Sequence, residues 1–205
     1  ERIEGTDLVF LRELTGGIYF GEKGRRDGGE TAFDNCVYTR FEVQRLAKKG
    51  FELAMTRTKK LCCVDKANVL ETSRLWRETV QAMEKDYPEV TVSYEFVDAV
   101  AMRLVQWPNS YDVLITENLF GDILTDEASV ISGSMGLMPS ASVGTENQLF
   151  EPIHGSYPQA TGLDIANPLA TVLSAAMMFE MAFNLKEEAE AIKAVVNKSL
   201  AEGIV

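Results

Sequence analysis

The residues best suited to chemistry are two carboxylates on one predicted helix. Asp122 and Asp126 stand four positions apart in the segment Phe-Gly-Asp-Ile-Leu-Thr-Asp. This spacing places both side chains on one helix face, and clustered carboxylates suit a hard divalent cation such as Mg²⁺ or Mn²⁺. The alternative is structural, because acidic residues near a helix N-terminus also complement the helix dipole. The spacing by itself leaves both interpretations open.

Three other reactive side chains stand at or near predicted strand ends. Lys66 follows an apolar strand, at the edge where parallel sheets bind ligands, and a lysine placed there can act as a base. Arg12 ends another apolar run and can hold a carboxylate through two parallel hydrogen bonds. Tyr19 lies among glycines, where its hydroxyl can donate a proton. The alternatives are a solvated lysine paired with Asp65, a surface ion pair for Arg12 and a packing role for Tyr19.

Several common types of site find no support in the sequence. His154 is the single histidine, which argues against histidine-dependent zinc sites but permits a Ser-His-Asp triad, although no Gly-x-Ser-x-Gly elbow accompanies it. The phosphate-binding P-loop and Gly-x-Gly-x-x-Gly patterns are also missing. The three cysteines, Cys36, Cys62 and Cys63, fit no metal spacing. We therefore interpret them as structural and expect a reducing, cytoplasmic environment.

The composition describes an ordinary soluble globular protein of one or two domains. The chain has 205 residues, of which 46% are hydrophobic and 25% charged, and a net charge of −11. No basic run is longer than a pair such as Arg25-Arg26, which argues against general nucleic-acid binding. No apolar run approaches the roughly 20 residues of a membrane helix. We expect neither a nucleic-acid nor a membrane partner.

Apolar runs of strand length alternate with segments of helical period, which predicts an α/β fold with parallel strands and flanking helices. Asn167 and Pro168 are typical of a helix start, as N-cap and first helical residue. Strands are predicted at 8–11, 60–64, 90–96 and 113–115. Helices are predicted at 41–55, 72–83 and 99–106, from about 122, from 168 to about 183, and at 187–201. A loop or arm is predicted at 16–30, and a long loop at 132–158.

Seven motifs, taken in order, resemble one enzyme family. They are Arg-Glu-Leu-Thr-Gly-Gly-Ile-Tyr-Phe-Gly, Val-Asp-Lys-Ala-Asn-Val-Leu, Val-Asp-Ala-Val-Ala-Met, Asn-Leu-Phe-Gly-Asp-Ile-Leu-Thr-Asp, Gly-Leu-Met-Pro-Ser-Ala-Ser, Glu-Pro-Ile-His-Gly-Ser and Ile-Ala-Asn-Pro. Together they span nearly the whole chain and resemble the isocitrate/isopropylmalate dehydrogenase family, nearer its isopropylmalate branch. The resemblance implies a metal-dependent oxidative decarboxylation of 3-isopropylmalate to 2-oxoisocaproate in leucine biosynthesis, with NAD⁺ as hydride acceptor.

The resemblance also implies roles for individual residues. Arg12 would grip the malate carboxylates, and Tyr19 and Lys66 would form the acid–base pair. Lys66 would reach the active site of the partner subunit, so the functional unit would be a homodimer. Asp98, Asp122 and Asp126 would bind Mg²⁺ or Mn²⁺, and Asp98 would also contact the partner's substrate. Val69 would line the isopropyl pocket. The cofactor would contact Asn68 near its nicotinamide and His154, Gly155 and Asn167 around its adenosine.

The cofactor segment departs from the family pattern at one position. Gln159 stands where NAD-using relatives usually carry an aspartate for the adenosine ribose. The basic residues expected of an NADP enzyme are missing there too, so NAD is the expected cofactor, with weaker discrimination. Asp164 is a partial substitute for the missing carboxylate on this interpretation.

The resemblance divides the chain into two parts. Residues 1–132 would be the second domain of the family, which holds the dimer, metal and substrate residues, and 133–205 would be part of the first, cofactor-binding domain with apolar helix faces left exposed. The family has further segments before Glu1 and after Val205, so we expect this chain to dimerise but to be inactive alone. The alternatives are a tartrate- or homoisocitrate-type relative, or a non-catalytic dimerisation module.

Overall fold

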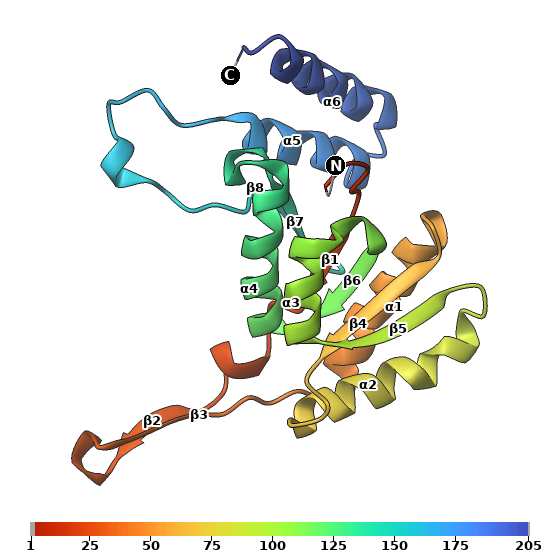
Figure 1. The fold of residues 1–205 in the computed structure, drawn as a ribbon, viewed down its shortest axis with the longest axis vertical. Helices are drawn as coiled ribbons and strands as arrows, with labels where there is room; N and C mark the ends of the chain where they lie inside the picture. Colours follow the sequence, from red (N-terminus) through yellow and green to blue (C-terminus); the bar gives the residue numbers. More distant parts are fainter. Residues whose placement is uncertain (1–2, 205) are drawn as a thin grey trace. The chain divides into compact units, whose positions relative to one another are not determined.

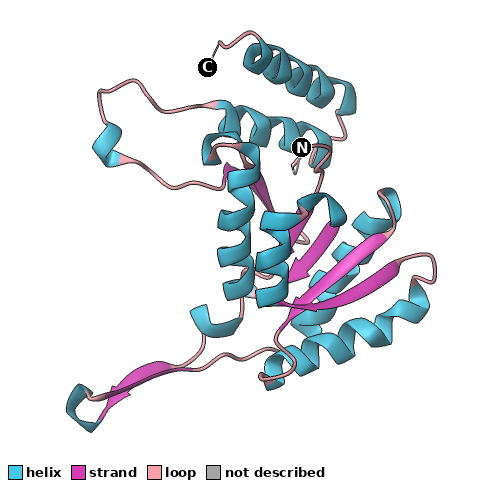
Figure 2. Ribbon diagram, viewed as in Figure 1, coloured by secondary structure: helices cyan, strands magenta, loops and turns pink. Residues whose placement is uncertain are grey.

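The computed structural model describes residues 3–204, and the chain divides into two units, Glu1–Ala128 and Ser129–Val205. Figures 1 and 2 show their elements. The boundary lies within the last turn of helix α4, Asn118–Ser129. The roles predicted for residues 1–132 and 133–205, metal and substrate against cofactor, stay predictions.

Four parallel strands form the sheet of the first unit. They are arranged in the order β1 (Val9–Arg12), β6 (Val113–Thr116), β4 (Lys60–Asp65) and β5 (Thr91–Phe96). Parallel strands need crossover connections, and the helices between these strands supply them. The predicted α/β fold with parallel strands is therefore confirmed, and the carboxyl ends of all four strands lie along one edge of the sheet.

Alternate residues of the strands face different helices. Gly50 of α1 (Arg40–Thr56) lies so close to Ile115 that an added Cβ would come within 2.6 Å of the isoleucine Cγ2. Gly121 of α4 lies equally close to Thr116, with 2.4 Å from an added Cβ to Oγ1. Successive strand residues point to opposite faces, so α1 covers one face of the sheet and α4 covers the other.

The main core lies on the α1 face of the sheet. Helix α2 (Glu71–Met83) packs there beside α1, and Trp76 meets Tyr38 edge-to-face with ring centroids 5.5 Å apart. The buried residues of this cluster are Tyr38, Val43, Ala47, Phe51, Ala54, Leu61, Cys63, Trp76, Val80, Val90, Val113 and Ile115. The predicted amphipathic helices at 41–55 and 72–83 are thereby confirmed, because their periodic apolar residues fill this core.

A two-stranded hairpin extends from the first unit (Figure 1). Strands β2 (Lys23–Arg26) and β3 (Thr31–Asp34) pair in antiparallel fashion around a turn in which Gly28 and Gly29 have positive φ. The sequence predicted a loop or arm here and missed the paired strands. Their residues are mostly exposed, so they lack the apolar alternation by which a half-buried strand is recognised.

The second unit contains a hairpin and two helices. Strands β7 (Pro139–Val143) and β8 (Gln148–Pro152) pair where the sequence predicted a long loop, so that prediction was wrong. Pro139 begins β7, a position where a strand tolerates proline. Helix α5 (Leu169–Met181) packs against this hairpin and against α6 (Lys186–Ala201). Within residues 3–204, no helix has the length and apolar character needed to cross a membrane.

Candidate active site

Arg12 is the centre of the predicted substrate site. Its Nε and Nη2 both donate to Oδ1 of Asn118, at 3.1 and 2.9 Å, and its Nη1 lies 2.6 Å from Oδ1 of Asp122. The guanidinium also stands 5.7 Å from the centre of the Tyr19 ring. The structure therefore brings Arg12, Tyr19 and Asp122 together from strand β1, the short helix Gly17–Tyr19 and helix α4.

Asp122 lies in the second turn of α4, because the helix begins at Asn118 and not near residue 122 as predicted. The helix dipole acts mainly on the first turn, so it does not explain this carboxylate. Its two oxygens instead accept from different donors, Oδ1 from Arg12 and Oδ2 from the Tyr19 hydroxyl at 2.6 Å. The hydrogen bond to Asp122 raises the pKa of Tyr19, because the protonated phenol is the donor.

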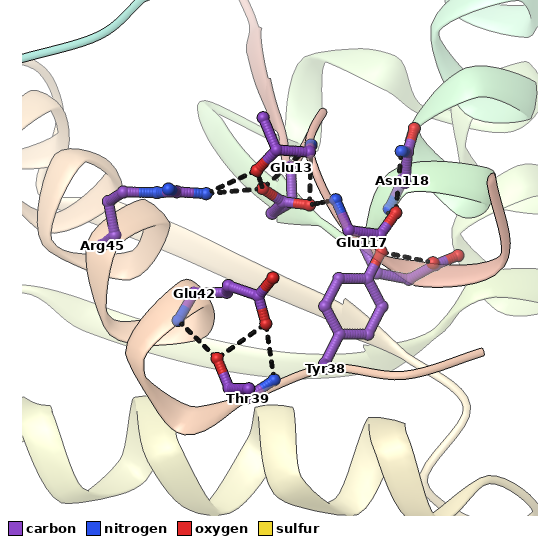
Figure 3. A network of polar contacts seen from close by, with 9 residues as sticks. Glu13, Tyr38, Thr39, Glu42, Arg45, Glu117 and Asn118 are labelled. Atoms are coloured by element: carbon purple, nitrogen blue, oxygen red, sulfur yellow. Dashed lines mark hydrogen bonds and ion pairs between the residues drawn. The ribbon is translucent and has the colours of Figure 1, made fainter. Parts of the chain in front are cut away.

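A buried polar network beneath Arg12 fixes the start of α4 (Figure 3). Asn118 donates from Nδ2 to the Gly16 carbonyl at 3.0 Å and from its backbone N–H to the Tyr38 hydroxyl at 2.9 Å. The Tyr38 hydroxyl donates to Oε2 of Glu117 at 3.0 Å. Burial raises the pKa of Tyr38. Glu117 in turn accepts from the backbone N–H of Phe120 at 2.7 Å and so caps the helix.

Glu13 holds the turn that follows β1. Its buried carboxylate accepts from the backbone N–H groups of Thr15 and Gly16, the latter at 2.7 Å. Arg45 of α1 donates to the same carboxylate at 2.7 Å (Figure 3). Near this contact, Thr39 and Glu42 form a reciprocal capping box that begins α1. The turn between Arg12 and Tyr19 is thus fixed from both the sheet and α1.

Two glycines allow the close packing around these side chains. An added Cβ at Gly121 would lie 2.6 Å from Cγ of Arg12, so the arginine stem lies directly on α4. Gly17 has a φ of +74°, and an added Cβ there would come within 2.2 Å of the Tyr38 hydroxyl. A side chain at Gly121 would displace Arg12, and one at Gly17 would displace Tyr38 or the turn that carries Tyr19.

Lys66 and Asp98 form a second cluster at the ends of β4 and β5. Lys66 Nζ lies 2.6 Å from Oδ1 of Asp98, and this contact lowers the pKa of Asp98. Lys66 is 26% exposed and its Nζ stands 5.6 Å from the Phe96 ring centre. The alternative pairing of Lys66 with Asp65 is wrong, because the buried Asp65 is held by Arg77 at 2.8 Å.

Carboxylates are ligands that a hard divalent cation prefers. The described residues of one chain, however, do not bring enough of them together to hold such a cation. The carboxylate oxygens of Asp122 are suited to a hard cation, which would replace the present ion pair with Arg12. Among residues 3–204, no three Asp, Glu, Cys or His side chains form a group able to hold a metal. The assignment of Asp98, Asp122 and Asp126 to a metal stays a prediction, and in that prediction Asp98 serves the partner's site.

The residues predicted for the cofactor, and Val69 predicted for the isopropyl pocket, lie in two places. Asn68 and Val69 occupy the turn after β4, with Val69 exposed. His154, Gly155 and Asn167 belong to the second unit, where His154 Nδ1 lies 3.0 Å from the Gly155 carbonyl oxygen. Asn167 Oδ1 accepts from the Leu169 N–H at 2.9 Å, but the N-cap of α5 is Pro168 and not Asn167 as predicted, because the helix begins one residue later. The roles predicted for these residues toward cofactor and substrate stay predictions.

Comparison with known proteins decides the family. The model of the family described as isocitrate/isopropylmalate dehydrogenase matches residues 1–205. The chain belongs to this family.

The relatives are dehydrogenases of the isopropylmalate and isocitrate types. The 3-isopropylmalate dehydrogenase of Bacteroides fragilis is 58% identical over 200 residues, which are 98% of this chain and 56% of the relative. That of Desulfitobacterium hafniense is 52% identical over 98% of this chain and 57% of its own length. The isocitrate dehydrogenase structure of Methylococcus capsulatus matches 98% of this chain and 62% of that chain, with 37% identity and a TM-score of 0.91. The chain spans little more than half the length of these curated relatives.

Several residues of this candidate site were not found from the sequence. Asn118, Glu117, Tyr38 and Glu13 touch or support Arg12 and Tyr19. Asn118 is the first residue of the motif that carries Asp122, and Glu13 follows Arg12 directly. These adjacencies were the available signal, but polar residues next to a motif are common and their burial is not visible in a sequence.

Replacing Tyr38 with phenylalanine tests the network in Figure 3. The change leaves Glu117 and the Asn118 N–H buried without their shared partner, so we expect unit 1 to lose about 1–3 kcal/mol of unfolding free energy. Urea unfolding followed by tryptophan fluorescence measures this, because both tryptophans, Trp76 and Trp107, lie in unit 1. Tyr157→Phe, at an exposed position of unit 2, is the control. Equal stability of both variants would contradict the network.

Replacing Lys66 with methionine tests the second cluster. Without the lysine hydrogen bond, the pKa of Asp98 should rise toward the ordinary aspartate value. A ¹³C NMR titration of the Asp98 carboxyl carbon measures this pKa, and Lys48→Met, which removes a surface lysine near Glu52, serves as the control. An unchanged Asp98 pKa in Lys66→Met would show that the two side chains do not pair in solution.

Proposed function

We propose that this chain carries the substrate, metal and acid–base residues of an enzyme that oxidises and decarboxylates 3-isopropylmalate to 2-oxoisocaproate with NAD⁺. One observation carries the proposal: Arg12, Tyr19 and Asp122 meet within hydrogen-bond distance in a chain of this dehydrogenase family. The relatives that are 52–58% identical are named 3-isopropylmalate dehydrogenases, which supports this substrate over isocitrate. A step of leucine biosynthesis is the corresponding pathway role.

Substrate binding would use Arg12. Its Nε and Nη2 are committed to Asn118, which fixes the plane of the guanidinium and directs Nη1 toward Asp122. A substrate carboxylate at Arg12 and a cation at Asp122 would replace their mutual ion pair by two new ionic contacts. The exchange keeps each charge paired, which lowers the desolvation cost of binding.

The proton steps would fall to Lys66 and Tyr19. Lys66 of one subunit, in its neutral form, would take the proton of the substrate hydroxyl, and NAD⁺ would serve as the hydride acceptor. After carbon dioxide leaves, Tyr19 would supply the proton to carbon. The hydroxyl of Tyr19 donates a hydrogen bond to Asp122 in the structure, so it carries the proton that this step needs.

A divalent cation, Mg²⁺ or Mn²⁺, would be held by Asp122 and Asp126 together with Asp98 of a second subunit. When bound, it would act as a Lewis acid toward the substrate oxygens. NAD⁺ would contact Asn68 near its nicotinamide and His154, Gly155 and Asn167 near its adenosine. Val69 would line the pocket for the isopropyl group, to which its exposed apolar side chain is suited.

The assay follows NADH absorbance with 3-isopropylmalate, NAD⁺ and Mn²⁺. The chain alone is expected to be silent, because it matches only 56% of the Bacteroides fragilis relative. The decisive protein is therefore a chimera in which these residues replace the matching segment of that relative. It should turn over 3-isopropylmalate with a kcat/KM about tenfold or more above that for isocitrate, tartrate and homoisocitrate.

Controls separate the alternatives. The same chimera with Asp122→Asn should fold, as judged by circular dichroism, and lose turnover. A folded chimera that prefers tartrate or homoisocitrate would replace the substrate assignment. A folded chimera that turns over none of these acids would favour a non-catalytic dimerisation module.

The proposal includes a homodimer with shared active sites. Helix α3 (Val97–Gln106) exposes Met102 and Val105, and α4 exposes Ile123, at 54%, 62% and 56%. Exposed apolar side chains on neighbouring elements are typical of a protein interface. A second copy covering them would also bring its own Lys66 and Asp98 to this subunit's substrate site under the proposed arrangement.

Light scattering after size-exclusion chromatography tests the dimer. The molar mass measured by light scattering should be twice the mass of one chain, which is 22.7 kDa. Val105→Glu and Ile123→Glu, which would place a charge in the apolar contact, should shift it toward the monomer. Val195→Glu, on an exposed position of α6, should leave the mass unchanged. A monomeric mass for the unaltered chain would contradict the proposal.

A further inference from the structure

One face of helix α2 holds the loop that follows strand β4. Ser73 Oγ accepts from the Lys66 N–H at 2.9 Å, and Arg74 Nε donates to the Ala67 carbonyl at 2.9 Å. Arg77, one turn further along, donates to Asp65 at the end of β4. The loop between Asp65 and Glu71 therefore has its backbone fixed at consecutive residues by side chains of a single helix.

Arg77 and Asp65 form a two-point contact between a guanidinium and a carboxylate. Arg77 Nε lies 2.8 Å from Oδ2 and Nη2 lies 3.0 Å from Oδ1 of Asp65. Asp65 is only 1% exposed, and its Oδ1 also accepts from the Ala67 N–H at 2.9 Å. A two-point guanidinium–carboxylate contact fixes orientation as well as distance. Ala67 is thereby tied to α2 through Asp65.

Phe96 connects Arg77 with Lys66 by a second route. The Arg77 guanidinium stands 5.4 Å from the Phe96 ring centre, and Lys66 Nζ stands 5.6 Å from the same ring. Tyr94 contacts the guanidinium as well, at 5.5 Å. A planar guanidinium packs against aromatic rings in a way that a lysine ammonium does not reproduce.

We propose that Arg77 is a positioning residue that sets where Lys66 stands. It acts through Asp65 on the backbone of the loop and through Phe96 on the lysine side chain. The same loop carries Asn68 and Val69, so their placement depends on Arg77 too. The catalytic meaning of this placement rests on the function proposed above, whereas the placement itself is a property of this chain.

Three variants separate positioning from general stability. Arg77→Lys keeps a positive charge beside the buried carboxylate but loses the two-point contact. The double variant Asp65→Asn with Arg77→Met removes both charges and keeps an oxygen for the Ala67 N–H, so it serves where Arg77→Lys fails to fold. Arg40→Met is the matched control, because Arg40 donates to Thr79 of the same helix away from the loop.

Two measurements on the 205-residue chain report the loop directly. Amide hydrogen exchange of the peptide around Ala67 should become about tenfold faster in Arg77→Lys, because the two-point contact with Asp65 no longer fixes the backbone of the loop. Acetylation of Lys66 at fixed pH, measured by mass spectrometry against the exposed Lys85, should increase several-fold. The thermal midpoint should change little, and Arg40→Met should change neither loop measurement.

The outcomes are distinct. Unchanged exchange and acetylation in both Arg77→Lys and the double variant would overturn the proposal, as would equal changes in Arg40→Met. In the chimera, Arg77→Lys should lower kcat/KM about 10–100-fold. If the chimera lacks dehydrogenase activity altogether, the proposed function fails, but the exchange and acetylation results still decide whether Arg77 positions Lys66.

Discussion

Asn118 is the residue through which the parts of the substrate site are joined. Its side chain is almost fully buried and contacts Arg12 at the end of β1 and the Gly16 carbonyl in the following turn, while its backbone begins α4. A buried amide must satisfy its donors and acceptor or lose the free energy of those hydrogen bonds. The arrangement that satisfies Asn118 is the one in which β1, the turn and α4 stand as observed, so the position of Arg12 follows from it.

The order of the strands explains why the functional residues form two clusters. Arg12 ends β1 and Asp122 lies in the helix after β6, whereas Lys66 and Asp98 follow β4 and β5. Neighbouring strands lie about 4.8 Å apart, so the ends of β6 and β5 are separated by about 10 Å. Within the part of the chain that the structure describes, no three Asp, Glu, Cys or His side chains form a group able to hold a metal, which is consistent with the proposed site shared between two subunits.

The sequence allowed prediction of those parts of the fold that are buried. Strands such as 113–115 and helices such as 41–55 carry apolar periodicity because each has a face in the core. The hairpin of β7 and β8 was missed, because small polar residues and Pro139 give its strands no such pattern. The start of α4 was placed too late, because Gly121 is a poor helix former and the contact with Arg12 that requires it comes from more than a hundred residues earlier in the chain.

For the site, residue types could be predicted but their partners could not. Lys66 was identified from its place after a strand, yet its pairing with Asp98 depends on a contact between Asp65 and Arg77, twelve positions apart. Asp65 and Asp98 are both possible partners of Lys66. Asp65 is buried and pairs with Arg77, so the exposed Asp98 is the carboxylate that remains for Lys66.

The same competition sets the charge balance of the site. Three carboxylates at the sheet edge each have one cationic partner: Asp122 has Arg12, Asp98 has Lys66 and Asp65 has Arg77. Each of these pairs is neutral in a chain of net charge −11. A divalent cation alone, or a dicarboxylate alone, would disturb this balance by two charges, whereas the two together would leave it unchanged. Under the proposed function, these pairs therefore favour binding of metal and dicarboxylate together over binding of either one alone.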